Sequence, residues 1–212
     1  MAAAASERRV LVALVFATLV PFALLAAWAR IASPAPWEPA ILAALTIGQG
    51  AAAEVVIVIN ELGNLPMWAA VVAVLSGAAL VARRTAAAVL LALSFFSDLA
   101  AFVVKLLVER VRPDTAAAEH LIGPDSFAYP SGHVVRAVAL AAVAAWLVAP
   151  RAARLPAALI AGLGAGTVMG YARVALNVHW PTDAIGGVLL GIGWFSITVL
   201  AVARAPAQRA AE

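Results

Sequence analysis

Apolar residues occur along this chain in six long runs that are separated by short polar segments. The runs cover residues 10–31, 66–82, 86–108, 134–149, 155–171 and 184–203. A helix that crosses a bilayer needs about 20 mostly apolar residues, with a usual range of about 17–25. The pattern therefore predicts an all-α fold, a bundle of six transmembrane helices that forms one integral membrane domain over residues 1–212.

Residues 33–65, after the first run, follow a different pattern. Apolar residues such as Ile41, Leu45, Val56 and Ile59 recur there at helical spacing, but Gln49, Glu54, Asn60 and Glu61 interrupt them. Such an amphipathic pattern is typical of a helix that lies in the membrane interface. We predict an interfacial helical segment here. If the segment crossed the bilayer instead, every later loop would change sides.

Charged residues decide between these two topologies. With six spans, one side of the membrane receives Arg8, Arg9, Arg83, Arg84, Arg151, Arg154, Arg204 and Arg209. The other side receives Glu38, Glu54, Glu61, Glu109, Asp114, Glu119 and Asp125. Because cytoplasmic loops carry the excess of Lys and Arg, six spans place both termini in the cytoplasm. The expected location is the cell membrane, with the acidic loops outside.

Composition excludes several classes of protein. The chain is 65% hydrophobic and 12% charged, has no cysteine and has three histidines. Disulfides and Cys-ligated metals are thereby excluded, and so few histidines leave little for a metal site, so we expect no cofactor and no metal. The net charge of +3 is spread over separated arginine pairs. No basic patch for nucleic acid is predicted.

Two polar motifs lie at the ends of one predicted helical hairpin. Runs 134–149 and 155–171 are joined by a short turn at Pro150 and Arg151, so residues 130–133 and 173–183 must share one face. Lys105 and Arg112 enter the loop that ends at Pro130. We therefore expect three motifs to meet at the extracytoplasmic face.

The first two motifs are suited to binding an anion. Lys105 and Arg112 are seven residues apart, so a continuing helix would point both cations the same way until Pro113 ends it. Pro130-Ser131-Gly132-His133 opens a helix, whose free backbone N–H groups attract anions. The alternatives are cations that reach for lipid headgroups and an ordinary turn before a helix.

The third motif contains a candidate nucleophile. Asp183 follows His179 by four residues, so it could accept from one imidazole nitrogen and leave the other free to attack phosphorus. His133 could then protonate the departing oxygen, while Arg173, with Arg112 and Lys105, neutralises the phosphate. The alternative is a capped helix start beside a merely interfacial histidine.

Together, Lys105-x6-Arg112-Pro113, Pro130-Ser131-Gly132-His133 and Arg173-x5-His179-x3-Asp183 resemble the signature of the type 2 phosphatidic acid phosphatase superfamily. The resemblance covers residues 105–183 by motif and, through the six-helix plan, nearly the whole chain. It implies metal-independent dephosphorylation of a lipid phosphate or diphosphate through a phosphohistidine. It also implies His179 as nucleophile, Asp183 as its partner and His133 as general acid. The implied phosphate cradle is Lys105, Arg112, Ser131, Gly132 and Arg173.

Four residues need separate comment. Ala172 stands where the family often has serine, which removes one hydroxyl from the expected cradle. Arg136 follows His133 by one turn and is a candidate for contacting a second phosphate. Asp98, inside a predicted span, is expected to face a partner such as Lys105 or Arg136, or to be neutral. His120 is expected to be a solvated loop residue.

The sequence thus predicts an integral membrane hydrolase for an isoprenoid or glycerolipid phosphate, such as undecaprenyl diphosphate or phosphatidic acid. Its partners are the lipid substrate and the bilayer. A phosphotransferase that uses the same pocket is an alternative, because any acceptor hydroxyl could capture a phosphohistidine. A small transporter is another, although no inverted repeat is visible. The lipid head group and tail, the preference between mono- and diphosphate and the oligomeric state stay open.

Overall fold

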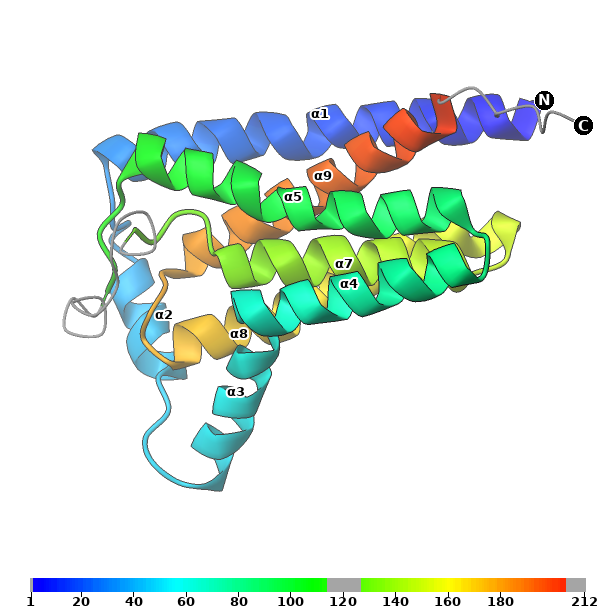
Figure 1. The fold of residues 1–212 in the computed structure, drawn as a ribbon. Helices are drawn as coiled ribbons and strands as arrows, with labels where there is room; N and C mark the ends of the chain where they lie inside the picture. The colour runs from blue at the N-terminus through cyan, green and yellow to red at the C-terminus, as the bar shows by residue number, and fades with distance from the viewer. Residues whose placement is uncertain (1, 114–126, 205–212) are drawn as a thin grey trace, which may run out of the picture.

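The computed structural model describes residues 2–113 and 127–204. Within these ranges, six long helices lie side by side in a bundle (Figure 1). They are α1 (Ala2–Ile31), α4 (Leu65–Val81), α5 (Thr85–Val108), α7 (Gly132–Val148), α8 (Arg154–Ala175) and α9 (Pro181–Arg204). All six coincide with the six apolar runs, because each run is long enough for a helix and is bounded by proline, glycine or charge.

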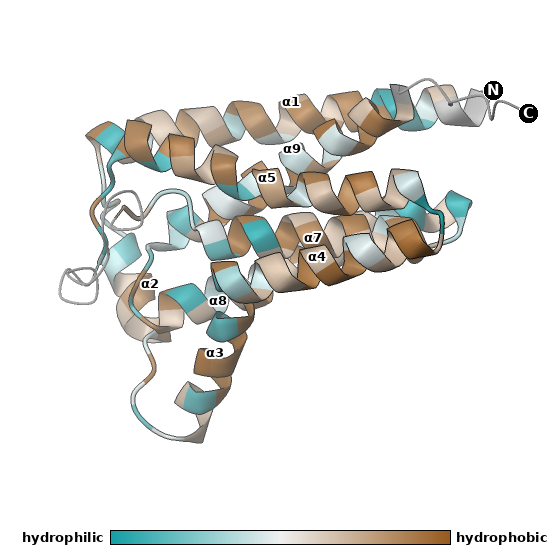
Figure 2. Cartoon of the chain, viewed as in Figure 1, coloured by the Kyte–Doolittle hydropathy of each residue, from teal (hydrophilic) through white to brown (hydrophobic). Residues whose placement is uncertain are grey.

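The outward faces of the long helices are apolar. Phe16 of α1 is 65% exposed, Val74 of α4 is 69% exposed and Ile160 of α8 is 73% exposed. Figure 2 shows hydrophobic residues along the length of the bundle and hydrophilic ones gathered near its ends. Side chains of this kind on the outside fit lipid rather than water as the surrounding solvent.

Four helices are long and apolar enough to cross a membrane alone, among the described residues: α1, α5, α8 (taken with the 3-10 turn η2, Arg151–Ala153) and α9. Helix α4 meets this test only together with α3 (Ala51–Leu62), and the two are bent by 54°. Helix α7, with 17 residues, is shorter. A multi-pass membrane protein follows from these helices, while six spans stay a prediction.

Helix α7 lies at the centre of the bundle, against α5, α8 and α9. Glycines let the backbones approach it closely. A Cβ atom on Gly191 of α9 would lie 2.6 Å from Cβ of Val138, and one on Gly166 of α8 would lie 2.8 Å from Cγ2 of the same valine. Small residues at such contacts are typical of helices that associate in membranes. The packing fixes the start of α7 between the neighbouring helices.

Residues 33–65 form two helices, α2 (Glu38–Leu45) and α3, instead of one segment. Both lie at one end of the bundle, where α3 projects away from it (Figure 1). Residues 60–64, which we call the α3–α4 elbow, pack onto the start of α7. A Cβ atom on Gly63 would lie only 2.6 Å from Cδ2 of His133, so a larger residue here would have to displace the imidazole ring. Its placement in the membrane interface stays a prediction.

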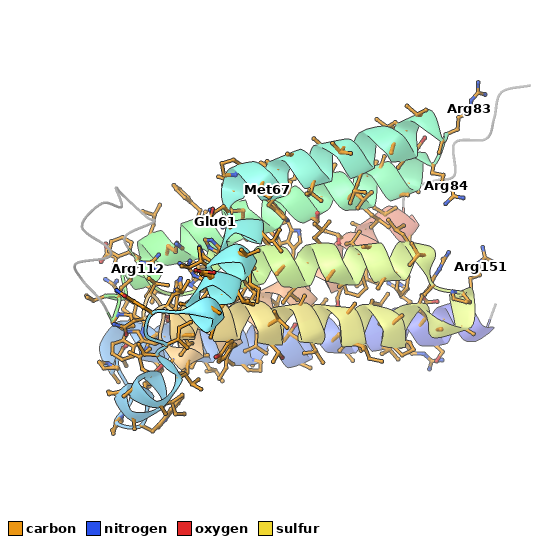
Figure 3. All side chains as sticks on the ribbon, turned by 90° about the horizontal axis from the view of Figure 1, so that it is seen from below. Glu61, Met67, Arg83, Arg84, Arg112 and Arg151 are labelled. Carbon is orange, nitrogen blue, oxygen red and sulfur yellow. The ribbon has the colours of Figure 1, made fainter. Side chains whose placement is uncertain are left out.

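The two ends of the bundle differ in what they carry. Arg83, Arg84 and Arg151 lie at one end, and Glu61 and Arg112 lie at the other (Figure 3). The start of α1 and the end of α9 both lie at the arginine end (Figure 1). Both ends of the described chain therefore lie at the end of the bundle that carries these arginines.

Three helix boundaries affect how the polar motifs are presented. Helix α7 begins at Gly132 and α8 continues to Ala175, so His133 and Arg173 lie inside helices. Helix α5 ends at Val108, and Glu109 adopts a left-handed conformation with φ of 52°. The helix therefore does not persist from Lys105 to Arg112, and a non-helical segment brings Arg112 to the site.

Candidate active site

A cavity of about 720 Å³ opens at the end of the bundle opposite Arg83 and Arg151. Its lining contains most of the polar residues singled out from the sequence: Asp98, Lys105, Arg112, Gly132, His133, Arg136, Arg173 and His179. The rest of the lining is Glu61, Asn64, Leu65, Pro66, Met67, Ala101 and Phe102. Four cations and two carboxylates thus face one space, which leaves an excess of positive charge for an anion.

His179 lies in the connection between α8 and α9 and is 1% exposed. Its Nε2 is 3.2 Å from Nη1 of Arg112, and its Nδ1 is 3.3 Å from Oδ2 of Asp183. A guanidinium only donates hydrogen bonds, so Nε2 carries the lone pair and Nδ1 carries the proton. This is the arrangement in which a carboxylate orients an imidazole and leaves Nε2 available as a nucleophile.

The start of α9 holds Asp183 in place. Pro181 opens the helix, and Oδ2 of Asp183 accepts a hydrogen bond of 2.8 Å from the backbone N–H of Trp180. A carboxylate in the first turn that reaches back to the residue before the helix is a capping interaction. The backbone N–H of Ser131 also donates to the carbonyl of Asp183, at 3.1 Å, which ties the starts of α7 and α9 together.

Arg110 joins Asp183 to a second buried carboxylate, that of Glu38. Its Nη1 donates to Oδ1 of Asp183 at 2.5 Å and its Nη2 donates to Oε2 of Glu38 at 2.6 Å. Its side chain is 1% exposed and those of Glu38 and Asp183 are 0% exposed. Trp28 and Trp180 have ring centroids 5.5 and 5.8 Å from the guanidinium carbon. This buried network supports the partner of His179 from behind.

Helix α2 thereby contributes to the site through Glu38. Its Oε1 accepts from the hydroxyl of Thr182 at 2.6 Å and from the backbone N–H of the same residue at 3.2 Å, and its Oε2 accepts from the backbone N–H of Ala35 at 2.8 Å. Every contact of this carboxylate is a donor, as a buried charge requires.

His133 contacts the α3–α4 elbow and its own helix. Its Nε2 is 2.9 Å from Oδ1 of Asn64, and its Nδ1 is 3.2 Å from Nη2 of Arg136. Arg136 also donates to the carbonyl of Gly63 at 2.9 Å and forms an ion pair with Asp98. The structure therefore pairs Asp98 with Arg136, one of the two partners that its place inside a span suggested.

The remaining cradle residues are placed as follows. Lys105, Arg112 and Arg173 are 5–8% exposed and line the cavity, and Arg173 donates to Oδ1 of Asn60 in the elbow. Ser131 is wholly buried at the start of α7 and does not line the cavity, and its hydroxyl has no hydrogen-bond partner among the described residues. His120 lies outside the described residues. Among those described, no group of His, Cys, Asp and Glu could hold a metal ion.

The chain is similar to proteins of one known family. The family model described as the PAP2 superfamily matches residues 85–206, more than half of the chain. The chain belongs to the PAP2 superfamily. Phosphatidylglycerophosphatase B of Bacillus subtilis is 33% identical over 71% of this chain and 75% of its own length. Decaprenylphosphoryl-5-phosphoribose phosphatase of Mycobacterium tuberculosis is 34% identical over 57% of this chain and 64% of its own length.

A solved structure shows that the PAP2 resemblance extends to the fold. The crystal structure of a transmembrane PAP2-type phosphatidylglycerolphosphate phosphatase from Bacillus subtilis superimposes with a TM-score of 0.72 and 28% sequence identity. It covers 87% of this chain and 94% of the other. The curated and structural relatives are PAP2 lipid phosphatases of membranes, which confirms the family suggested by the three motifs.

The sequence alone did not point to several residues of this PAP2 site. Arg110 lies two residues before Arg112 in the same short segment, but nothing local marks it as the buried member of the pair. In the sequence, Glu38 stands out only as an acidic residue of the predicted outer side. Asn64 gave no signal, and Asn60 and Glu61 only marked the elbow as polar. Their partners are far away in sequence, and only the packing of α2 and α3 onto the bundle reveals them.

Proposed function

We propose that this protein is a metal-independent lipid phosphatase that works through a phosphohistidine on His179. The observation that carries the proposal is the position of His179, which is fixed by Asp183 on one side and turns Nε2 toward a cationic cavity on the other. The relatives support the substrate class, an isoprenoid or glycerolipid phosphate, because one is named as a phosphatidylglycerophosphatase and another as a decaprenylphosphoryl-5-phosphoribose phosphatase.

The reaction proceeds in two steps. Nε2 of His179 attacks phosphorus as the bond from phosphorus to the lipid oxygen breaks, and His133 gives a proton to that oxygen. Water then attacks the phosphohistidine, His133 takes a proton from the water, and the nitrogen–phosphorus bond breaks to release inorganic phosphate. Lys105, Arg112 and Arg173 offset the charge on the phosphoryl oxygens in both steps.

The walls of the cavity suit a lipid. Leu65, Met67 and Phe102 are apolar, line the cavity and are 43–49% exposed. A hydrocarbon chain can therefore leave the cavity along α4 and α5 while the phosphate stays among the cations. The arginine end of the bundle faces the cytoplasm by the positive-inside rule, and six spans then place the cavity at the outer face. Both termini are cytoplasmic in this arrangement.

Trapping the intermediate tests the proposal. The purified protein is mixed in detergent with phosphatidic acid labelled with ³²P, in the presence of a chelator, and quenched within one turnover. We expect label on the protein that survives alkali and is lost in acid, as a phosphohistidine requires, and that disappears in His179→Gln. Steady turnover without a labelled protein, label that is stable to acid, or activity that stops with the chelator would contradict it.

The pH dependence provides a second prediction. Burial lowers the pKa of His179 well below its usual 6.5, and the cations of Arg112, Arg173 and Lys105 lower the pKa further. His179 must be neutral to attack, so we expect kcat/KM to stay high as the pH falls through 6.5 and to decline only below it.

Removing one of these cations should shift the acidic decline of kcat/KM in a defined direction. Lys105→Met removes a positive charge that disfavours the imidazolium, so the acidic decline of kcat/KM should move to higher pH. The measurement is phosphate release between pH 4 and pH 8 at constant ionic strength. A wild-type decline centred at or above pH 6.5, or a shift to lower pH in the variant, would contradict the role of His179.

A further inference from the structure

We propose that Arg136 is a positioning residue that holds His133 as the tautomer with its proton on Nε2, with Asn64 fixing the same tautomer from the other side. This inference rests on the proposed function, because it specifies how His133 serves as the donor to the leaving oxygen. It differs from the role suggested by sequence, in which Arg136 contacts a second phosphate.

The first argument starts from Arg136. A guanidinium has five N–H donors and no acceptor, so Nδ1 of His133, 3.2 Å from Nη2, must present its lone pair. A proton on Nδ1 would point at a cation. The resting imidazole is therefore neutral and carries its proton on Nε2.

The second argument starts from Glu61 and reaches the same nitrogen. An ionised carboxylate only accepts, so the Asn64 amide must turn Nδ2 toward Oε2 of Glu61, at 2.5 Å. Its Oδ1 then faces Nε2 of His133 at 2.9 Å and needs a donor. The two arguments use different residues on different helices, and both place the proton on Nε2.

Arg136 is itself held by the surrounding structure. It donates to the carbonyl of Gly63 and to Asp98, and its guanidinium carbon lies 5.9 Å from the ring centroid of Trp68. Asp98 offsets the charge of Arg136, and the side chain of Arg136 is only 8% exposed. With these contacts in place, Arg136 is better placed to orient His133 than to bind a second phosphate. When a leaving oxygen displaces the amide of Asn64 from Nε2, it meets an N–H donor. The oxygen takes that proton as its bond to phosphorus breaks, the ring becomes an imidazolate whose charge Arg136 offsets at Nδ1, and the attacking water returns the proton in the second step.

Substrates with different leaving groups test this role. An alkoxide leaves poorly without a proton, whereas nitrophenolate leaves readily, so loss of the donor should slow formation of the phosphohistidine only with the first kind. We compare the single-turnover rate of phosphohistidine formation from a short-chain phosphatidic acid and from p-nitrophenyl phosphate, because the later hydrolysis by water is common to both substrates. The protein tested is the double variant Arg136→Met with Asp98→Asn, which leaves no buried charge alone. We expect a loss of at least about tenfold for the lipid and less than about threefold for the aryl ester.

Two further variants sharpen the comparison. Arg136→Lys keeps a donor for Nδ1 and a charge for Asp98, so the ratio of the two single-turnover rates should stay near that of the wild type. Arg154→Gln is the matched control. Arg154 also stacks on a tryptophan, with its guanidinium carbon 5.9 Å from the ring centroid of Trp146, but it lies at the start of α8, at the other end of that helix from Arg173. Equal losses on both substrates in the double variant would mean a structural role only and would overturn the inference.

The tautomer can also be read without turnover. In protein labelled with ¹⁵N-histidine, the ring nitrogens of His133 are assigned by their absence in His133→Gln. We expect the protonated nitrogen to be Nε2 in the wild type and a mixture of tautomers in the double variant. A wild-type ring protonated on Nδ1 overturns the inference even if the protein is a phosphatase. Conversely, a protein without phosphatase activity but with Nε2 protonated would contradict the proposed function alone.

Discussion

His179→Gln is expected to lower kcat for lipid phosphate hydrolysis by about 10⁴-fold or more, because glutamine has no nitrogen that can attack phosphorus and form the intermediate. Phosphate release from phosphatidic acid in detergent micelles measures the effect. KM should change much less, since Lys105, Arg112 and Arg173 still hold the phosphate. Loss of a nucleophile is the largest single effect on activity that we expect in this chain.

The third histidine supplies the matched control for this variant. His120→Gln removes an imidazole of the same kind that lies outside the cradle motifs, and its kcat should stay within about twofold of the wild type. Both proteins should be compared at equal yield of folded material. A His179→Gln enzyme that keeps a tenth or more of the wild-type kcat would rule out a phosphohistidine mechanism on this residue.

Arg110→Met is expected to cause the largest loss of stability, about 3–5 kcal/mol, because it leaves the carboxylates of Glu38 and Asp183 buried without their cation. Unfolding in detergent with increasing denaturant measures it. Activity should fall as well, since Asp183 loses the donor that fixes its Oδ1. Adding Glu38→Gln to this variant removes one of the two orphaned charges and should restore part of the lost stability.

An exposed ion pair provides the comparison for Arg110. Arg30 pairs with Glu109 at 3.2 Å, but both side chains are about half exposed, at 52% and 53%. Water and salt weaken such a pair, so Arg30→Met should cost less than about 1 kcal/mol. If Arg110→Met destabilises the protein no more than Arg30→Met does, the buried network does not stabilise the fold as we describe.

The long helices and the family could be predicted from sequence because both depend on local patterns. Apolar runs define helices wherever they lie, and the motifs around His133 and His179 are short. The hairpin of α7 and α8 also follows from chain connectivity, which brings the ends of those helices together. The apolar run places the first turn of α7 two residues late, because Gly132 and His133 are small or polar and do not extend such a run.

The long-range contacts that hold the site residues in place could not be predicted from local patterns. Glu38 contacts Arg110 across 72 residues and Asn64 contacts His133 across 69 residues. Hydropathy describes how one segment prefers lipid or water, and it contains no information on which distant segment will cover a motif. By hydropathy, the polar residues of the α3–α4 elbow therefore resemble the solvent-exposed side of an interfacial helix, although Asn60 contacts the buried Arg173 and Asn64 contacts His133.

The reactive residues and the residues that orient them come from two different parts of the chain. Every proposed catalytic and cradle residue lies within the matched stretch 85–206, yet Glu38, Asn60, Gly63 and Asn64 come before it. A protein that received only the signature motifs would hence contain the reactive groups without the residues that orient them. A working protein would therefore need the segment that contains Glu38 and the elbow as well as the signature.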